Sequence, residues 1–148
     1  MKQKQQWLAL VALILLLSLA ACGGSPSPAA PVVDEPAAAE VSLEELPKDL
    51  DVETVYEIKD NPDVYLIDVR EQAEYDEKHI PEINLLPMST IENRLDEIPS
   101  NKTVVITCRS GNRSSQVTDY LRANGFNNVH NMTGGINEWE SAGFPVEQ

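Results

Sequence analysis

The sequence predicts an α/β domain with a central, mostly parallel sheet that is flanked by helices on both faces. Short apolar runs typical of buried strands alternate along the chain with stretches whose apolar residues recur at helical spacing. Several strand-like runs are apolar at successive positions, as in parallel strands that are covered on both sides. Hydrophobic residues make up 42% of the 148 residues, so the chain can build a packed core.

The first half of the domain contains four expected elements. Residues 52–58 carry apolar side chains at helical spacing after Asp51, which is a suitable N-cap. Residues 64–67 form a short apolar run that predicts a buried strand. Residues 71–78 are polar and helix-prone, and residues 83–86 predict another short strand that ends before a proline.

The second half of the domain contains five expected elements. Residues 91–98 place three aliphatic side chains on one helical face, which predicts a helix. Residues 103–107 are β-branched throughout and are the best candidate for a central strand. A helix around residues 117–125 is expected to end at a glycine cap. Residues 128–132 predict a last strand, and residues 136–142 predict a last helix.

The first forty residues differ in composition from the domain. Residues 7–21 are apolar apart from one serine and follow two lysines, a pattern that is short for a membrane span and typical of a signal peptide. The run ends in Leu19, two alanines and Cys22, which resembles the lipobox of bacterial lipoproteins. This resemblance implies a signal peptide over residues 1–21, lipidation of Cys22 and an extracytoplasmic protein that only its lipid anchors to a bacterial membrane. The alternative is an ordinary secreted protein with an incidental cysteine.

A flexible tether and an acidic domain are expected to follow the signal peptide. Residues 22–40 are rich in Pro, Ala, Gly and Ser and contain no aromatic residue, so they form the tether, and residues 41–148 form the domain. The domain contains 9 basic and 21 acidic residues, which give a net charge of −12. This acidity argues against nucleic acid as a partner, because phosphate binding needs a basic face. It is also expected to repel anionic ligands at long range.

The chemistry-bearing residues follow the best predicted strand. Cys108 directly follows that strand, and a short polar loop leads from it into the next helix. A strand, a tight loop and a helix N-terminus together present backbone N–H groups to an anion. A cysteine held there is expected to be a stabilised thiolate and a nucleophile, whereas the alternative is a buried, inert cysteine. The predicted anion-binding loop consists of Arg109, Ser110, Gly111, Asn112, Arg113 and Ser114.

Several motifs together give a specific resemblance to a protein family. The motifs are Leu66-Ile67-Asp68-Val69-Arg70, Glu74-Tyr75, His79-Ile80-Pro81, Cys108-Arg109-Ser110-Gly111-Asn112-Arg113-Ser114, Gly134-Gly135-Ile136 with Trp139, and Gly143-Phe144-Pro145-Val146. With these motifs in the family's order, residues 64–146 resemble a single-domain rhodanese, a sulfurtransferase. The resemblance implies a rhodanese-like fold for the domain.

The resemblance also implies a mechanism. The Cys108 thiolate would take the outer sulfur of a small anionic donor such as thiosulfate as a persulfide, and a thiol or cyanide would then accept that sulfur. The N–H groups of the loop would stabilise the persulfide, and Arg109 and Arg113 would orient the donor. No metal or organic cofactor is implied. A persulfide-carrying protein is a further candidate partner, and the domain is expected to be a monomer.

Other functions remain open at this point. The domain could be a non-catalytic rhodanese-like module that binds a partner, or a thiol-redox module whose Cys108 forms mixed disulfides. Cysteine-dependent phosphatases and arsenate reductases are a minor alternative. They place five residues between the cysteine and the arginine, whereas four residues separate Cys108 from Arg113. The shorter loop favours a sulfur-sized anion over tetrahedral phosphate.

One acidic and one basic residue, which follow a neighbouring strand, have two possible roles. Asp68 and Arg70 follow residues 64–67, so they either contact the pocket or, as we favour, support the sheet edge and its loop through ion pairs and backbone bonds. His79 is expected to be structural, because a thiolate that its loop already stabilises needs no general base. His130 stands alone in the sequence and is expected at the surface.

The turns around His79 depart from the family pattern. Many rhodaneses have glycine on either side of the His-Ile-Pro stretch, whereas this chain has Lys78 and Glu82 there. Both turns must therefore be made without the conformational freedom of glycine.

Overall fold

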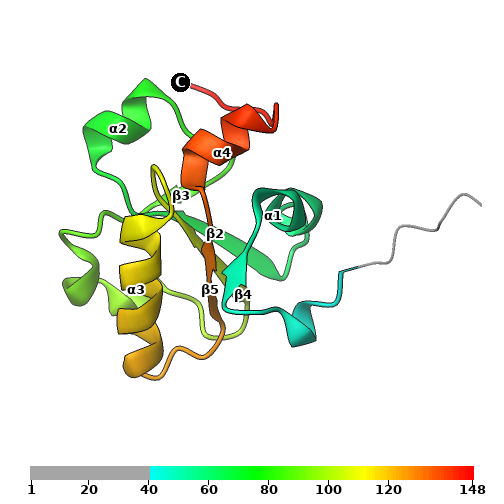
Figure 1. Ribbon diagram of the computed structural model, residues 1–148. Helices are drawn as coiled ribbons and strands as arrows, with labels where there is room; N and C mark the ends of the chain where they lie inside the picture. The colour runs from blue at the N-terminus through cyan, green and yellow to red at the C-terminus, as the bar shows by residue number, and fades with distance from the viewer. Residues whose placement is uncertain (1–40) are drawn as a thin grey trace, which may run out of the picture. The chain divides into compact units, whose positions relative to one another are not determined.

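A five-stranded parallel sheet forms the centre of the domain. The computed structural model describes residues 41–148, so the expected signal peptide, the lipidated Cys22 and the tether lie outside the described residues. Within that part, the strand order is β1-β5-β4-β2-β3 and every pairing is parallel (Figure 1). The α/β class with a flanked central sheet is confirmed. No helix in residues 41–148 is long and apolar enough to cross a membrane.

The strands agree with the sequence patterns that predict them, with one addition. They are β1 (Asp49–Leu50), β2 (Val64–Asp68), β3 (Asn84–Leu85), β4 (Thr103–Thr107) and β5 (Val129–Met132). The β-branched β4 lies in the middle of the sheet, as predicted, because its side chains are buried from Val104 onward. The edge strand β1 is missing from the sequence prediction, because two residues cannot show a periodic pattern.

The helices begin and end at the residues that cap them. They are α1 (Val52–Ile58), α2 (Gln72–Glu77), α3 (Asn112–Ala123) and α4 (Gly135–Ser141). The Asp51 carboxylate accepts a hydrogen bond of 2.8 Å from the Thr54 N–H, which confirms the predicted N-cap. At the end of α3, Gly125 takes a left-handed conformation and the Phe126 N–H donates to the Leu121 carbonyl, so the predicted glycine cap is confirmed.

The prediction of one helix over residues 91–98 is wrong. The segment contains two short 3₁₀ turns, η2 (Ile91–Asn93) and η3 (Leu95–Glu97), and a further 3₁₀ turn, η1 (Leu43–Glu45), precedes β1. Arg94 separates η2 from η3 with φ −133° and ψ 26°, which is not a helical conformation. Ile91 and Ile98 are nevertheless both buried, so the apolar spacing reflects burial correctly.

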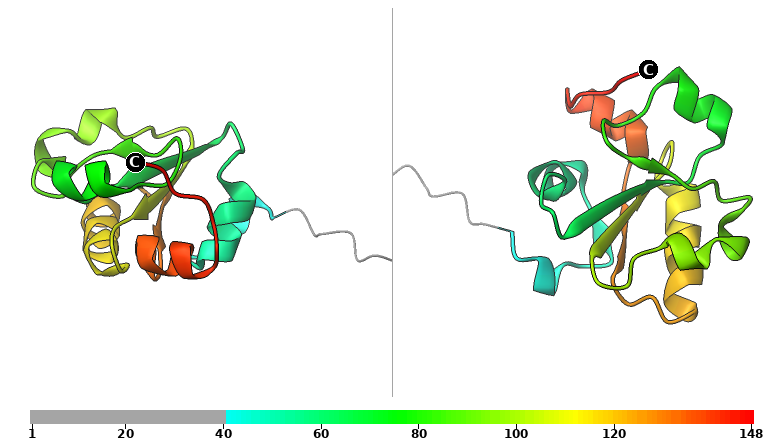
Figure 2. Two further views of the ribbon diagram at one scale, coloured as in Figure 1. Left: turned by 90° about the horizontal axis from the view of Figure 1, so that it is seen from above. Right: turned by 180° about the vertical axis from the view of Figure 1, so that it is seen from behind.

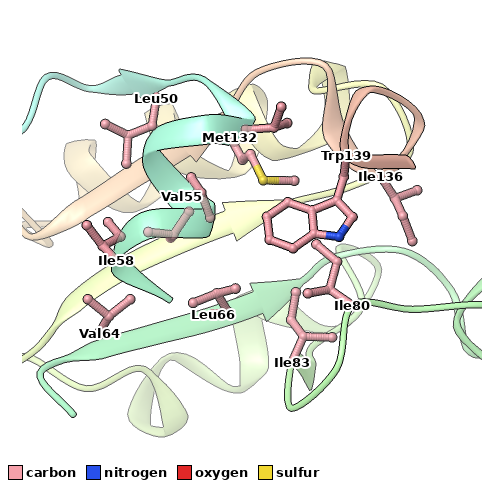
Figure 3. Close-up of a cluster of buried hydrophobic side chains, with 12 residues drawn as sticks. Leu50, Val55, Ile58, Val64, Leu66, Ile80, Ile83, Met132, Ile136 and Trp139 are labelled. Atoms are coloured by element: carbon pink, nitrogen blue, oxygen red, sulfur yellow. The ribbon is translucent and has the colours of Figure 1, made fainter. Parts of the chain in front are cut away.

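Two hydrophobic clusters fix the layers on either side of the sheet. The first lies between the sheet and helices α1 and α4, where Trp139 is completely buried among aliphatic side chains (Figure 3). The Trp139 indole N–H donates to the Pro145 carbonyl at 2.8 Å, which satisfies its one polar atom. The second cluster packs against α3, η2 and η3. These elements lie on the opposite face of the sheet from α1 and α4 (Figure 2). Helices therefore cover both faces, as the sequence predicts.

The expectation that His130 lies at the surface is wrong. His130 lies on β5 and is only 7% exposed, and the segment that leads into β1 lies beside this strand. Its Nδ1 forms a hydrogen bond of 2.7 Å with the Pro47 carbonyl. Burial is the main reason that the pKa of His130 is below its ordinary value. Its hydrogen bond therefore holds the segment before β1 against β5.

Candidate active site

The predicted site residues lie together at the carboxyl ends of the parallel strands. Asp68 and Thr107 are register partners at the carboxyl ends of β2 and β4, and Cys108 follows Thr107. Ligands of open α/β sheets bind at this edge. Helix α2, helix α4 and the loop between β4 and α3 lie at the same end of the sheet (Figure 1). The fold thus brings Cys108 together with segments that are distant in the sequence.

Hydrogen-bond donors surround the sulfur of Cys108. Burial raises the pKa of this thiol, but donors to the sulfur lower it further than burial raises it, so the net pKa lies below the ordinary value. These donors are the Ser114 hydroxyl and the backbone N–H groups of Ser114, Ser110 and Gly111. A lowered pKa favours the thiolate form of Cys108.

The Ser114 hydroxyl has a choice between two acceptors. Its oxygen lies 3.5 Å from the Cys108 sulfur and 3.0 Å from the Gly111 carbonyl oxygen. A hydroxyl has a single proton, so it donates to one of them at a time. An ionised sulfur is the stronger acceptor because hydrogen bonds to charged groups are stronger than neutral ones. The hydroxyl can therefore rotate to the sulfur as Cys108 ionises.

Close backbone packing holds the loop against the start of α4. The Ile136 N–H donates to the Cys108 carbonyl at 2.9 Å, and the Asn137 N–H donates to the Arg109 carbonyl at 3.1 Å. Gly135 has φ 61°, and a Cβ atom there would lie 2.4 Å from the Cys108 carbonyl oxygen. Only glycine allows the backbone at position 135 to lie this close to the Cys108 carbonyl, so the Gly134-Gly135 motif is needed for the packing of α4 against the loop.

The loop exposes its first side chains and hides its sulfur. Cys108 is 1% exposed, and Gly111 and Ser114 are also buried. Arg109, Ser110 and Asn112 are exposed, and Arg113 is partly buried. The sulfur is therefore recessed, so a donor must present a small terminal atom to reach it.

Arg113 has a partner that the sequence prediction missed. Its two terminal nitrogens donate to the two Glu74 carboxylate oxygens at 2.6 and 2.7 Å, which joins α3 to α2. The hydrogen bond from Arg113 is the main reason that the pKa of Glu74 falls to about 2. The Glu74-Tyr75 motif was the available signal, but nothing in the sequence pairs residues that are 39 positions apart.

Asp68 and Arg70 form a buried ion pair beside the site. Their side chains are 1% and 3% exposed, and the Arg70 guanidinium donates to both Asp68 oxygens at 2.7–3.0 Å. Arg70 also donates to the Lys78 carbonyl at 2.7 Å, which holds the turn after α2. These contacts agree with the supporting role that the sequence analysis favours for this pair.

The two turns that lack glycine have different backbone conformations. Lys78 has an extended backbone with φ −172°, so no glycine is required there. Glu82 has φ 63°, a left-handed conformation that side chains disfavour. Between them, His79 stacks on Tyr75 with ring centroids 3.9 Å apart, and its backbone bridges Glu147 near the C-terminus. His79 is thus placed as a structural residue.

Two surface hollows of the described part of the domain lie away from Cys108. Surface hollows are lined by Ser100, Asn128 and their neighbours, which precede β4 and β5 and so lie at the opposite edge of the sheet from Cys108. Across residues 41–148, no group of three or more His, Cys, Asp or Glu side chains is arranged to hold a metal ion. The recessed Cys108 remains the candidate centre.

Known proteins share the fold and parts of the sequence. The model of the rhodanese-like domain family matches residues 51–142. A protein named sulfurtransferase from Allochromatium vinosum is 44% identical over 89 residues, which cover 60% of this chain and 83% of that protein. A protein named thiosulfate sulfurtransferase GlpE from Pseudoalteromonas translucida is 30% identical, with coverage of 64% and 90%.

A solved structure gives the same result for the fold. The crystal structure of a rhodanese-like domain protein from Staphylococcus aureus has a TM-score of 0.61 and 30% sequence identity, and the match covers 69% of this chain and all of that one. The family model covers more than half of the 148 residues and includes α1 through α4. The chain therefore belongs to the rhodanese-like domain family.

Proposed function

We propose that this protein is a sulfurtransferase that carries sulfur as a persulfide on Cys108. The proposal rests on one observation. The Cys108 thiol is recessed, and the Ser114 hydroxyl and three backbone N–H groups beside it lower its pKa. A low-pKa thiol at a loop before a helix is an activated nucleophile. Relatives named sulfurtransferase add support.

The proposed reaction has two displacement steps. The Cys108 thiolate attacks the outer sulfur of thiosulfate, the bond between the two thiosulfate sulfurs breaks, and its electron pair leaves with sulfite. Cys108 then carries a persulfide anion, which the N–H groups of the loop stabilise. An acceptor thiolate, or cyanide, attacks the terminal sulfur of the persulfide and regenerates the Cys108 thiolate. Neither step needs an external oxidant or reductant.

The chemical steps can be tested by intact mass. The purified full-length chain, reduced and then treated with thiosulfate, is expected to gain one sulfur atom and to lose it when cyanide is added. The Cys108→Ser variant is expected to gain none. A variant that still acquired sulfur would place the chemistry elsewhere, and a reactive wild-type Cys108 that never acquired sulfur from any donor would exclude the transferase.

The binding-module alternative rests on a specific observation. Cys108 is 1% exposed, and Arg113 is paired with Glu74. The thiol is therefore less accessible, and fewer arginines are free to bind a donor, than the sequence predicts. A module that only binds a partner would keep the loop and lack turnover. Thiocyanate production from thiosulfate and cyanide distinguishes the two functions, because only the transferase gives many product molecules per chain.

We also propose that the domain is lipid-anchored outside the cytoplasm. Support comes from the sequence alone: the apolar run over residues 7–21 and Cys22 directly after its small residues. Two or more acyl chains are needed for stable anchoring. Radiolabelled palmitate is expected to enter the wild-type protein and not Cys22→Ala, and the variant is expected to leave the membrane fraction. Label in both proteins, or in neither, would refute the anchor.

A further inference from the structure

We propose that Glu74, by neutralising Arg113, makes this site discriminate against sulfur donors that carry two negative charges. This inference rests on the proposed sulfurtransferase function and names the residue that selects the donor. Glu74 acts through Arg113 rather than on the substrate, so it is a positioning and specificity residue.

The first step concerns the arginines at the carboxyl edge of the sheet. Arg70 is engaged by the Asp68 carboxylate in a buried bidentate pair. Arg113 is engaged end-on by both Glu74 oxygens at 2.6 and 2.7 Å. Arg109 is exposed and has no ion-pair partner within residues 41–148. The site therefore has one uncompensated arginine rather than the two that the sequence predicts.

The second step concerns the effect of the Glu74 charge near the sulfur. The Glu74 carboxylate and the Arg113 guanidinium are only about one-third exposed, at 29% and 33%, so solvent screens their charges incompletely. Apart from Glu74, the charges of the Cys108 thiolate and of Asp68 also raise the pKa of Arg113. Glu74 thus lies in the same electrostatic environment as the reacting sulfur.

The third step compares donors of different charge. Thiosulfate is a dianion, and it must approach an anionic sulfur with one unpaired arginine nearby and a domain whose net charge is −12. A persulfide or a thiosulfonate carries one negative charge, so the same unfavourable potential costs it half as much. The ion pair therefore selects for monoanionic donors.

A matched pair of donors tests the inference. Methanethiosulfonate resembles thiosulfate in shape, but a methyl group replaces one charged oxygen, and methanesulfinate leaves in place of sulfite. In Glu74→Gln, the amide can still accept the Glu71 N–H at the start of α2, but the negative charge is removed. We expect kcat/KM for thiosulfate to rise about three- to tenfold, through KM, and kcat/KM for methanethiosulfonate to rise by about the square root of that factor.

The control variant removes a charge from the same helix. Glu77 is exposed at the end of α2, and its side chain forms no hydrogen bond or ion pair within the described residues, so Glu77→Gln is expected to leave the ratio of the two donors unchanged. An equal change in Glu77→Gln and Glu74→Gln would overturn the inference, because the ratio would then report only the net charge of the domain.

Two further variants cover the case in which Glu74→Gln folds poorly. Glu74→Asp keeps the charge, so the donor ratio is expected to remain within about twofold of wild type. The double variant Glu74→Gln/Arg113→Gln removes a neutral pair, and its KM for thiosulfate is also expected to stay near the wild-type value. A large rise in KM in the double variant would mean that Arg113 binds the donor directly, and the inference would be wrong.

The outcomes separate this inference from the proposed function. If wild-type protein acquires sulfur from neither donor, the sulfurtransferase proposal fails. If wild-type protein acquires sulfur and the donor ratio of Glu74→Gln equals that of wild type, only the role of Glu74 fails.

Discussion

At the scale of single residues, the reactivity of Cys108 depends on the hydroxyl of Ser114. That hydroxyl lies 3.5 Å from the sulfur and is the strongest of the donors that lower the pKa of the thiol. A thiol whose pKa is lowered is ionised above that pKa, so removing a donor raises the pKa and reduces the thiolate fraction at neutral pH. We expect alkylation of Cys108 in Ser114→Ala to be about three- to tenfold slower at pH 7.

The pH profile provides the check on this prediction. The rates of wild type and Ser114→Ala are expected to converge at high pH, where both thiols are ionised, and to diverge as the pH falls. Ser115→Ala is the matched control, since the Ser115 hydroxyl makes no hydrogen bond within residues 41–148. A slower rate that persisted equally at every pH would indicate a steric change rather than a change in ionisation.

A second residue-scale prediction concerns Glu82. Its φ of 63° is unfavourable for a residue with a Cβ atom, and its side chain is exposed. Glu82→Gly is therefore expected to raise the free energy of unfolding by about 0.5–1 kcal/mol, measured by urea denaturation. Lys78→Gly is expected to lower it, because the extended backbone of Lys78 does not need glycine. Destabilisation by both substitutions would show that Glu82 makes a compensating contact.

Single residues also show what the sequence can and cannot predict. Cys108 and its loop are local features, since the strand, the turn and the helix start are consecutive in the chain, and so they can be found without a structure. The partners of Arg113 and His130 lie 39 and 83 positions away, so only the folded chain defines them. The sequence marks Lys78 and Glu82 alike as turns without glycine, and it does not distinguish the extended Lys78 from the left-handed Glu82.

At the scale of elements, the start of α4 supports the loop that begins at Cys108. The ideal Cβ position at Gly135 lies 2.4 Å from the Cys108 carbonyl oxygen and 2.7 Å from the Ser110 nitrogen. Gly135→Ala is expected to cost about 3 kcal/mol or more and to abolish persulfide formation, because backbone atoms cannot move aside cheaply. The free energy of unfolding and intact mass after thiosulfate treatment measure the two effects.

The matched control for Gly135 is another glycine of positive φ. Gly143 has φ 81° and no heavy atom within 4 Å of its ideal Cβ position. Gly143→Ala is therefore expected to cost only about 1 kcal/mol of backbone strain and to leave sulfur uptake intact. Comparable losses in both variants would mean that φ, and not the close approach of α4 to the loop, determines the requirement for glycine.

Element boundaries were predictable where burial and capping agree. Residues 52–58 combine a helical apolar spacing with an N-cap, and residues 103–107 are β-branched at every position, so both elements were predicted correctly. Before residues 91–98, the Thr90 hydroxyl donates to the Pro87 carbonyl and makes no cap hydrogen bond, and the chain forms two 3₁₀ turns there instead. Burial of Ile91 and Ile98 requires only that both face the core, which either structure satisfies.

At the scale of the whole molecule, the proposed anion-binding loop belongs to a strongly acidic domain. Residues 41–148 carry a net charge of −12, while the loop contributes one unpaired arginine. The long-range field repels anions and is screened beyond about 10 Å at 0.1 M salt, whereas the N–H groups around Cys108 act at contact distance. Added salt is therefore expected to weaken the repulsion more than the attraction.

Two alkylating reagents of similar shape and different charge measure this balance. Iodoacetate is an anion and iodoacetamide is neutral, so the ratio of their rates with Cys108 isolates the electrostatic contribution from the ionisation of the thiol. Raising the salt concentration from about 10 to about 200 mM is expected to increase the ratio about two- to threefold. A falling ratio would show that the local attraction of Arg109 and the helix N-terminus outweighs the net charge, and that the acidity of the domain does not control which donors reach the sulfur.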